Sequence, residues 1–277
     1  METTTPKNPD LEQKDSAEDG GTYMSLGDHI DEFRIRLTYA ILGIVLTVTV
    51  SLFFTSGFIS YIRQPYISIM LSQGMDPKMQ SISPTEGFAT YIKVCLILGL
   101  TIAAPWVFYQ LWKFVSVGLY PSERKLVNIA IPLAACLFMS GVLFFAIFIA
   151  PLTLKFFIVF NKTVLGIESV FTFEKYISFL TTMTLIFGLS FQTPIAVFII
   201  NKLGIISIET LARSRKYVVL VVVILAAVLT PGPDVISQIS LAIPLYFLFE
   251  LGIFLSRLSE KKAQADIAAQ QLADQPL

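Results

Sequence analysis

The stretches that decide the fold are YVVLVVVILAAVLT at residues 217–230 and VISQISLAIPLYFLF at residues 235–249. Both are uncharged and compatible with a helix. At a rise of about 1.5 Å per residue, runs of this length reach only ~21 to 23 Å across a hydrocarbon core of roughly 30 Å. The bilayer must thin there, or the chain must bend around a dip, at fractions of a kcal/mol per Å of mismatch. A thin wall is unusual in a sealed transporter and favours a protein that helps others cross.

The composition is that of a protein whose solvent is the bilayer. Of 277 residues, 55% are hydrophobic and 14% are charged, whereas a soluble domain carries about 25% charged residues. Four further uncharged runs, at 37–62, 94–112, 126–154 and 176–201, are each long enough to span a membrane. The sequence therefore predicts an all-α integral membrane protein with six transmembrane helices, at about 37–62, 88–112, 126–154, 174–201, 216–230 and 235–256.

Prolines interrupt several of these runs. Each removes a backbone donor, and such breaks persist in a membrane only where neighbours satisfy the freed carbonyl. They are Pro105, Pro132, Pro151, Pro194 and Pro244. We expect a curved, concave bundle with two short final helices. No internal repeat is evident, which argues against a secondary transporter, whose halves usually echo each other in hydropathy.

The distribution of basic residues predicts the topology. Fourteen of the 20 lysines and arginines lie in the N-terminal segment, in alternate loops and in the C-terminal segment. By the positive-inside rule both termini are cytoplasmic. We expect a disordered acidic tail at 1–24, a membrane domain at 25–258 and a cytoplasmic tail at 259–277. The net charge of zero provides no overall field to attract nucleic acid.

An amphipathic segment precedes the first span. Leu26, Ile30, Phe33 and Leu37 recur at helical intervals, which predicts a helix that lies on the cytoplasmic surface and runs into the membrane. Its polar face carries Glu32 one turn before Arg36, so that a solvated pair within the helix explains this glutamate without any function.

The segment WKFVSVGLYPSERK at 112–125 interleaves aromatic and charged residues at the membrane boundary. Glu123 lies near the start of the third helix, where the helix dipole alone accounts for a carboxylate. A second explanation is open, in which two cytoplasmic carboxylates form a two-point site for a cationic ligand. Arginine is the natural ligand, because its planar fork bonds a carboxylate in bidentate fashion.

Other chemistry has little support in the sequence. Cys95 and Cys136 lie inside apolar runs, and His29 is the only histidine, so we expect no disulfide framework, metal site or cofactor. Catalytic clusters of His, Asp, Glu or Ser are absent from the pattern, which argues against an enzyme.

Several segments together resemble the TatC family, the multispanning core of the twin-arginine protein translocase. They are HIDEFRIRL at 29–37, SPTEGF at 83–88, YQLW at 109–112 with ERK at 123–125, FGLSFQTP at 187–194 and TPGPDVISQ at 230–238. The resemblance runs in order from about Ser25 to Arg257 and is highly specific. It implies a receptor that binds twin-arginine signal peptides and exports folded proteins with the proton motive force.

The resemblance also implies the binding residues. Glu32 and Glu123 match the two glutamates that recognise the arginines in the family. The aromatic surface beside them matches Phe114, Tyr120 and Pro121, and the basic positions, which could hold the glutamates in place, match Arg34 and Arg124.

One family position differs in this chain. Many members have a glutamate in the fourth span where this chain has Gln192, so a charge-dependent role there is not expected. An amide avoids the ~2.5 to 3.5 kcal/mol cost of a midplane charge and still bonds a partner helix. Gln238 has the same two explanations, partner contact or packing.

Three further residues match family positions. Pro65 lies in the first external loop. Asp234 matches the short outer turn, although a helix cap also explains it. Glu250 lies toward the cytoplasmic end of the last helix and can pair with Arg257 or a partner.

These observations predict a receptor and core subunit of the translocase. Its expected partners are signal peptides of folded cargo, single-span subunits resembling TatA and TatB, further copies of itself and the bilayer, with no nucleic acid. The expected location is the bacterial inner membrane. The alternative, an ion-coupled small-solute transporter, would need ionisable groups facing a midplane cavity, and the spans hold almost none.

Overall fold

The computed structural model describes residues 26–118, 124–168, 170–229 and 235–273. These form an almost entirely helical chain with one pair of two-residue strands. In chain order the elements are α1 (Leu26–Ser72), β1 (Met79–Gln80), α2 (Glu86–Val117), α3 (Arg124–Phe144), the π-helix η1 (Phe145–Ile149), α4 (Ala150–Thr163), β2 (Phe171–Thr172), α5 (Phe173–Ser190), α6 (Thr193–Lys202), α7 (Ile208–Arg213), α8 (Arg215–Leu229) and α9 (Val235–Ala273).

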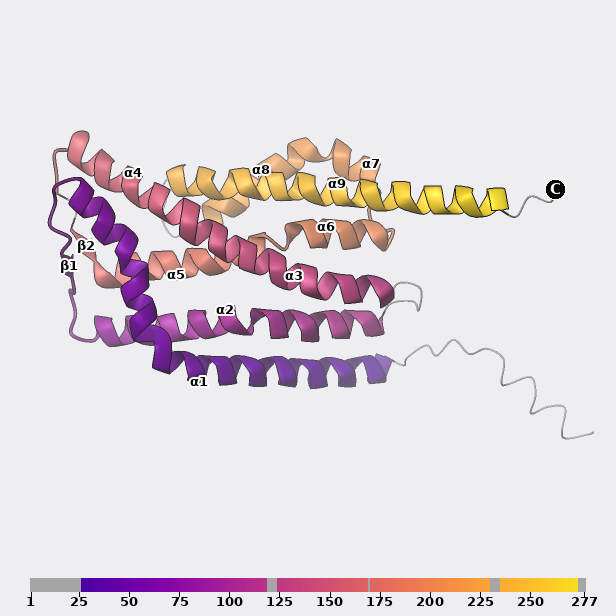
Figure 1. Ribbon diagram of the computed structural model, residues 1–277, viewed down its shortest axis with the longest axis horizontal. Helices are drawn as coiled ribbons and strands as arrows, with labels where there is room; N and C mark the ends of the chain where they lie inside the picture. The colour runs from indigo at the N-terminus through magenta and orange to yellow at the C-terminus, as the bar shows by residue number, and fades with distance from the viewer. Residues whose placement is uncertain (1–25, 119–123, 169, 230–234, 274–277) are drawn as a thin grey trace, which may run out of the picture.

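The long helices run side by side along the longest axis of the molecule (Figure 1). One end, here called the terminal end, holds the start of α1, the end of α2, the start of α3 and the end of α9. The opposite end holds β1 and β2 and is called the strand end. Within the described residues, five helical segments are long and apolar enough to cross a membrane: His29–Ser72, Glu86–Val117, Asn128–Thr163, Phe173–Lys202 and Val235–Lys261. The prediction of an all-α membrane protein is confirmed.

The first helix is longer than the sequence suggests. The amphipathic segment forms the first turns of α1, which runs unbroken from Leu26 to Ser72. Pro65, expected in an external loop, lies inside this helix. The helix continues past the proline because the next residue, Tyr66, is fully buried and packs against the rings of Phe171 and Tyr176. The second half of α1 thereby leans across the bundle toward α4 (Figure 1).

Of the two final helices, only α8 is short. It has 15 residues, about 22 Å at 1.5 Å per residue, and falls below the length of the five spanning segments. The last apolar run also ends early, at Phe249, but its helix α9 continues for 39 residues to Ala273. The residues beyond Phe249 include Glu250, Arg257 and several alanines, which favour a helix in water as well as in lipid.

Prolines account for the breaks in the third and fourth spans. The third span is divided into α3, η1 and α4, and Pro151 lies in the first turn of α4, directly after the π-helix. The fourth span ends α5 at Ser190 and resumes as α6 at Thr193, with Pro194 in the first turn. A proline has no donor for the preceding turn, so the ladder is interrupted just before it. Pro105, Pro132 and Pro244 lie within continuous helices.

The core lies between α1, α4, α5, α8 and α9, and aromatic side chains pack among its aliphatic ones. Phe145 and Phe187 are each 1% exposed and their ring centroids are 5.2 Å apart. Tyr66, Ile158 and Leu241 are buried in the same cluster. Association of helices in lipid depends on close packing and interhelical hydrogen bonds, because lipid tails are as apolar as leucine.

Helices α1 and α2 meet along a seam of small and polar residues. A Cβ on Gly99 would lie 2.6 Å from the Val48 Cα, so the two backbones approach as closely as a glycine permits. Ser51 Oγ donates to the Cys95 carbonyl over 2.7 Å. At the terminal side of the seam, Trp106 Nε1 donates to the Tyr39 carbonyl over 2.9 Å. This seam fixes the mutual position of α1 and α2.

Glu86, in the first turn of α2, joins two segments of the strand end. One of its carboxylate oxygens accepts from the backbone N–H groups of Ile82 and Ser83, over 2.6 and 3.2 Å. The other accepts from the backbone N–H of Glu174, in the first turn of α5, over 3.0 Å. The parallel pairing of β1 with β2 lies beside this contact. Glu86 therefore ties the start of α2 to the start of α5.

Replacing Glu86 with glutamine should loosen the strand end. A neutral amide accepts more weakly than a carboxylate and cannot satisfy all these donors at once. Amide hydrogen exchange at 79–86 and 171–175 should become several-fold faster, without change at 105–117. Glu168→Gln is the matched control, because Glu168 is an exposed glutamate of the same end. Equal exchange in both variants would contradict the joining role of Glu86.

Candidate functional site

Glu32 lies on α1 at the terminal end and is paired within its own helix. The Arg36 Nε lies 2.6 Å from the Glu32 Oε1, one turn further along. The Glu32 side chain is 23% exposed and that of Arg36 is 29% exposed, so the pair is accessible from solvent. Among the described residues, no group bonds the second carboxylate oxygen, Oε2. Within the described part of the chain, Glu32 therefore has one oxygen oriented by Arg36 and one without a partner.

Gln110 on α2 anchors this pair from the neighbouring helix. Its Oε1 accepts from the Arg36 Nη1 over 3.3 Å, and the residue is only 3% exposed. A buried amide with a fixed partner holds its orientation well. The contacts from Gln110 to Arg36 and from Arg36 to Glu32 thus orient the carboxylate on α1 relative to α2.

Three aromatic rings form a cluster at the same end of α1 and α2 as Glu32. The ring centroid of Phe114 on α2 is 4.7 Å from that of His29 and 5.3 Å from that of Phe33, both on α1. Phe114 was predicted as part of the site, and the structure brings it to the same end as Glu32. His29 has the packing role that the sequence favours for a lone histidine.

Of the two basic residues considered for Glu32, Arg36 contacts it, as the spacing predicts. Arg34, which the family resemblance suggests as a residue that holds the glutamate, is exposed and its side chain has no ion pair in the described part of the chain. It lines a shallow hollow with Asp31 and Tyr39 on another face of α1. A helix turns about 100° per residue, so position 36 shares a face with position 32 and position 34 does not.

Several predicted residues cannot be placed. Tyr120, Pro121, Glu123 and Asp234 lie outside the described residues, and of Arg124 only its place at the start of α3 is described. The second carboxylate of the expected two-point site therefore stays a prediction.

The predicted intramembrane polar residues each bond within the chain. Gln192 Nε2 donates to the Ala134 carbonyl of α3 over 2.9 Å, at the break between α5 and α6. Gln238 Nε2 donates to the Val223 carbonyl over 3.2 Å, which joins α9 to α8. Both amides thus have a packing role, the simpler of the two explanations.

Glu250 pairs with Arg215, and not with the expected Arg257. Arg215 at the start of α8 donates through Nη2 over 2.9 Å, and its Nε lies 2.6 Å from the other oxygen. Tyr246 adds a hydroxyl donor over 3.1 Å. Because Arg215 is far from Glu250 in sequence, periodicity within α9 could not indicate this contact.

The site has the geometry for cation recognition. No group of three or more His, Cys, Asp or Glu side chains that could hold a metal occurs within the described ranges. Glu32, a partly exposed carboxylate with one open oxygen beside an aromatic surface, is complementary to a guanidinium, which bonds carboxylates and stacks on rings.

Comparisons with known proteins identify the family of the chain. The family model described as Sec-independent protein translocase protein (TatC) matches residues 28–244. The chain belongs to the TatC family. The TatC of Carboxydothermus hydrogenoformans is 36% identical over 86% of this chain and 95% of its own length. The TatC of Escherichia coli is 33% identical over 83% of this chain and 86% of its own.

A solved structure extends the agreement to the fold. A crystal structure of the twin-arginine translocase receptor TatC superposes with a TM-score of 0.73 at 31% identity, and the match covers 84% of this chain and 99% of that one. This TatC protein is accordingly a membrane subunit of the Sec-independent protein translocase and acts in protein transport as a receptor, not as an enzyme.

Proposed function

We propose that this TatC protein binds twin-arginine signal peptides at the terminal end, with Glu32 accepting one arginine. The observation that carries the proposal is the geometry of Glu32, whose Oε1 is oriented by Arg36 and whose Oε2 has no partner among the described residues. A peptide guanidinium bonding Oε2 adds a charge-assisted hydrogen bond without breaking the internal pair. The rings of Phe114, His29 and Phe33 provide a surface on which the flat face of the guanidinium can stack.

The internal pair does not prevent binding. Partly exposed ion pairs of the i, i+4 type contribute only about 0.3 to 0.5 kcal/mol. A charge-assisted hydrogen bond to a carboxylate contributes about 1.5 to 3 kcal/mol. Even if the peptide arginine displaced Arg36 completely, Gln110 Oε1 would remain as an acceptor for the displaced guanidinium.

Glu123 is assigned the second arginine by the family resemblance. It directly precedes Arg124, the first residue of α3, and α3 starts at the terminal end. Arg124, Tyr120 and Pro121 belong to the same proposed surface. Once one arginine of the peptide is bound, the second contact forms within the same complex and adds to the affinity. A peptide therefore needs both arginines to engage both carboxylates.

The remaining assignments follow from the same function. The terminal end faces the cytoplasm of a bacterium, with the chain in its inner membrane and both termini inside. Residues 25–258 form the membrane domain, and the acidic segment 1–24 and the segment 259–277 flank it. Single-span subunits resembling TatA and TatB, and further copies of this chain, complete the complex, which uses the proton motive force.

Photo-crosslinking tests the peptide site. We place a photoreactive amino acid at Phe33, an exposed residue whose ring contacts Phe114, and at Leu71, exposed at the strand end, as a control. In membranes, a twin-arginine peptide should label position 33 about tenfold more than its twin-lysine version, the ratio for one lost bidentate contact of roughly 1.4 kcal/mol. Equal labelling by both peptides, or stronger labelling at position 71, would refute the proposal.

A further inference from the structure

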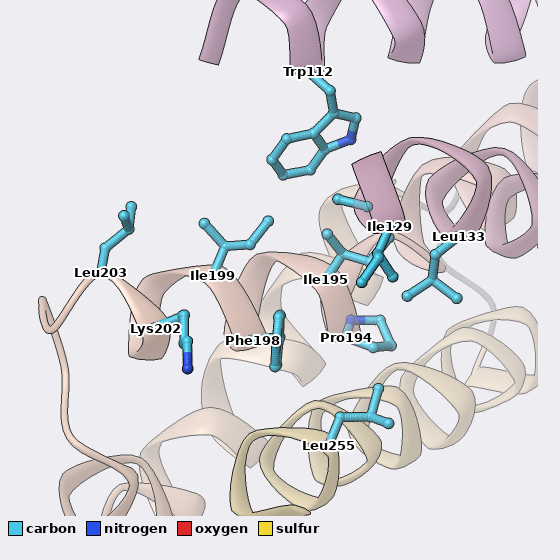
Figure 2. Close-up of a pocket in the computed structure, with 11 residues that line it drawn as sticks. Trp112, Ile129, Leu133, Pro194, Ile195, Phe198, Ile199, Lys202, Leu203 and Leu255 are labelled. Atoms are coloured by element: carbon cyan, nitrogen blue, oxygen red, sulfur yellow. The ribbon is translucent and has the colours of Figure 1, made fainter. Parts of the chain in front are cut away.

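An apolar pocket of about 170 Å³ lies between α3 and α6, away from Glu32. Figure 2 shows it lined by Ile129 and Leu133 of α3, by a row of α6 side chains, by Trp112 of α2 and by Leu255 of α9. None of the residues that hold Glu32 contributes to it. The binding function proposed above leaves the pocket unexplained.

The pocket has the size and lining of a hydrocarbon site. An engineered cavity of about 150 Å³ lined by Leu, Ile and Phe stays dry and binds benzene, so this volume accommodates about six carbon atoms. That is one segment of an acyl chain. Ile129, at one wall, is 65% exposed in the isolated chain, so the pocket communicates with the surface. In a membrane the molecules available to fill it are lipids.

Lys202 is the one charged residue lining the pocket. It is the last residue of α6 and lies at the end of the row of α6 side chains that face the pocket (Figure 2). Its ammonium group has no ion pair within the described ranges. Basic groups between membrane helices at a bilayer boundary favour anionic lipid headgroups. The same charge disfavours a cationic signal peptide, which is the competing occupant.

We propose that this pocket binds one acyl chain of an anionic phospholipid, with Lys202 bonding the headgroup phosphate. The lipid would lie between α3 and α6, next to the break that Pro194 introduces. Because Gln192 bonds α3 at this break, the lipid and the amide hold the same two helices together. The site is independent of Glu32, so its failure would leave the peptide-binding proposal standing.

The test uses the full chain in nanodiscs that contain phosphatidylcholine and a trace of phosphatidylglycerol with a photoreactive group near the end of one acyl chain. Labelling at 129–133 and 194–203 should exceed that by the corresponding phosphatidylcholine probe. Lys202→Gln should lower the phosphatidylglycerol labelling about fivefold, the factor for one lysine at an anionic surface. Ile199→Trp, which fills the pocket, should abolish labelling by both probes. Lys216→Gln, an exposed lysine outside the pocket, is the matched control and should change nothing.

Three results would overturn the proposal. If the two probes label equally, and Lys202→Gln does not change that labelling, then the charge of Lys202 plays no part in binding. A loss as large in Lys216→Gln as in Lys202→Gln would show a general surface effect. Displacement of the lipid by an excess of twin-arginine peptide would assign the pocket to the peptide. Affinity for that peptide, measured in parallel, should be the same in Lys202→Gln as in the unchanged protein.

Discussion

Replacing Glu32 with glutamine should weaken the binding of a twin-arginine peptide by about 10- to 150-fold. This range corresponds to the loss of one charge-assisted hydrogen bond, about 1.5 to 3 kcal/mol. The amide keeps the size of the side chain and one acceptor oxygen, so the loss of affinity measures the contribution of the negative charge of Glu32. Arg36 should retain its bond to Gln110 in the variant, because that contact does not involve Glu32. Titration of purified protein with a fluorescent peptide measures the effect.

Asp31→Asn is the matched control for Glu32. Asp31 is the adjacent exposed carboxylate, but it lies on another face of α1, in the hollow with Arg34. Its affinity change should stay within about twofold, as for a rim charge screened by solvent. Raising the salt concentration should weaken the residual binding of both variants alike. If Asp31→Asn lost as much affinity as Glu32→Gln, the peptide would be responding to the general charge of α1 and not to the site.

Replacing Gly99 with valine should be the most destabilising single change in the α1–α2 seam. The Cβ of the new side chain would lie 2.6 Å from the Val48 Cα, which is backbone and cannot rotate away. The helices must separate, which also stretches the nearby 2.7 Å bond from Ser51 to the Cys95 carbonyl. Overpacking of this kind costs about 3 kcal/mol, at the upper end of the usual range. Reversible unfolding in mixed micelles measures it.

Gly57→Val provides the comparison on the same helix. Nothing lies within 4 Å of a Cβ at Gly57, and the residue is exposed. The free energy of unfolding should change by less than about 1 kcal/mol, because only helix propensity is affected. Similar losses for both substitutions would mean that the seam tolerates separation and that the close approach at Gly99 does not determine stability.

Much of the fold was predictable, because hydrophobicity and proline chemistry act locally. The long apolar runs, the short α8 and the break before Pro194 are all visible in the sequence. The apolar runs do not predict the lengths of α1 and α9. A helix continues beyond its apolar run wherever its polar side chains reach water or bond buried partners, and the run does not show where that is. Tyr66 holds the far end of α1 through Phe171 and Tyr176, a contact across about a hundred residues that no local pattern contains.

The candidate site shows the same division. The i, i+4 spacing predicts the pair of Glu32 with Arg36, and the structure confirms it. Gln110 was not predicted, although it lies in the YQLW segment that carries the family resemblance, because its role depends on α1 and α2 meeting along the seam. The sequence leaves the partner of Glu250 open between Arg257 and another protein, for the same reason: Arg215 is on α8, and only the packing of α8 against α9 brings it near.

The carboxylate bonds of Glu86 have a mechanical consequence. They lock the start of α2 to the start of α5 at one end of the molecule, and the α1–α2 seam locks the first two helices along their length. These three helices therefore behave as a single rigid frame. Helix α8 packs mainly against α9, and α9 mainly against α6, so a movement of these helices relative to the frame would hinge at the break between α5 and α6.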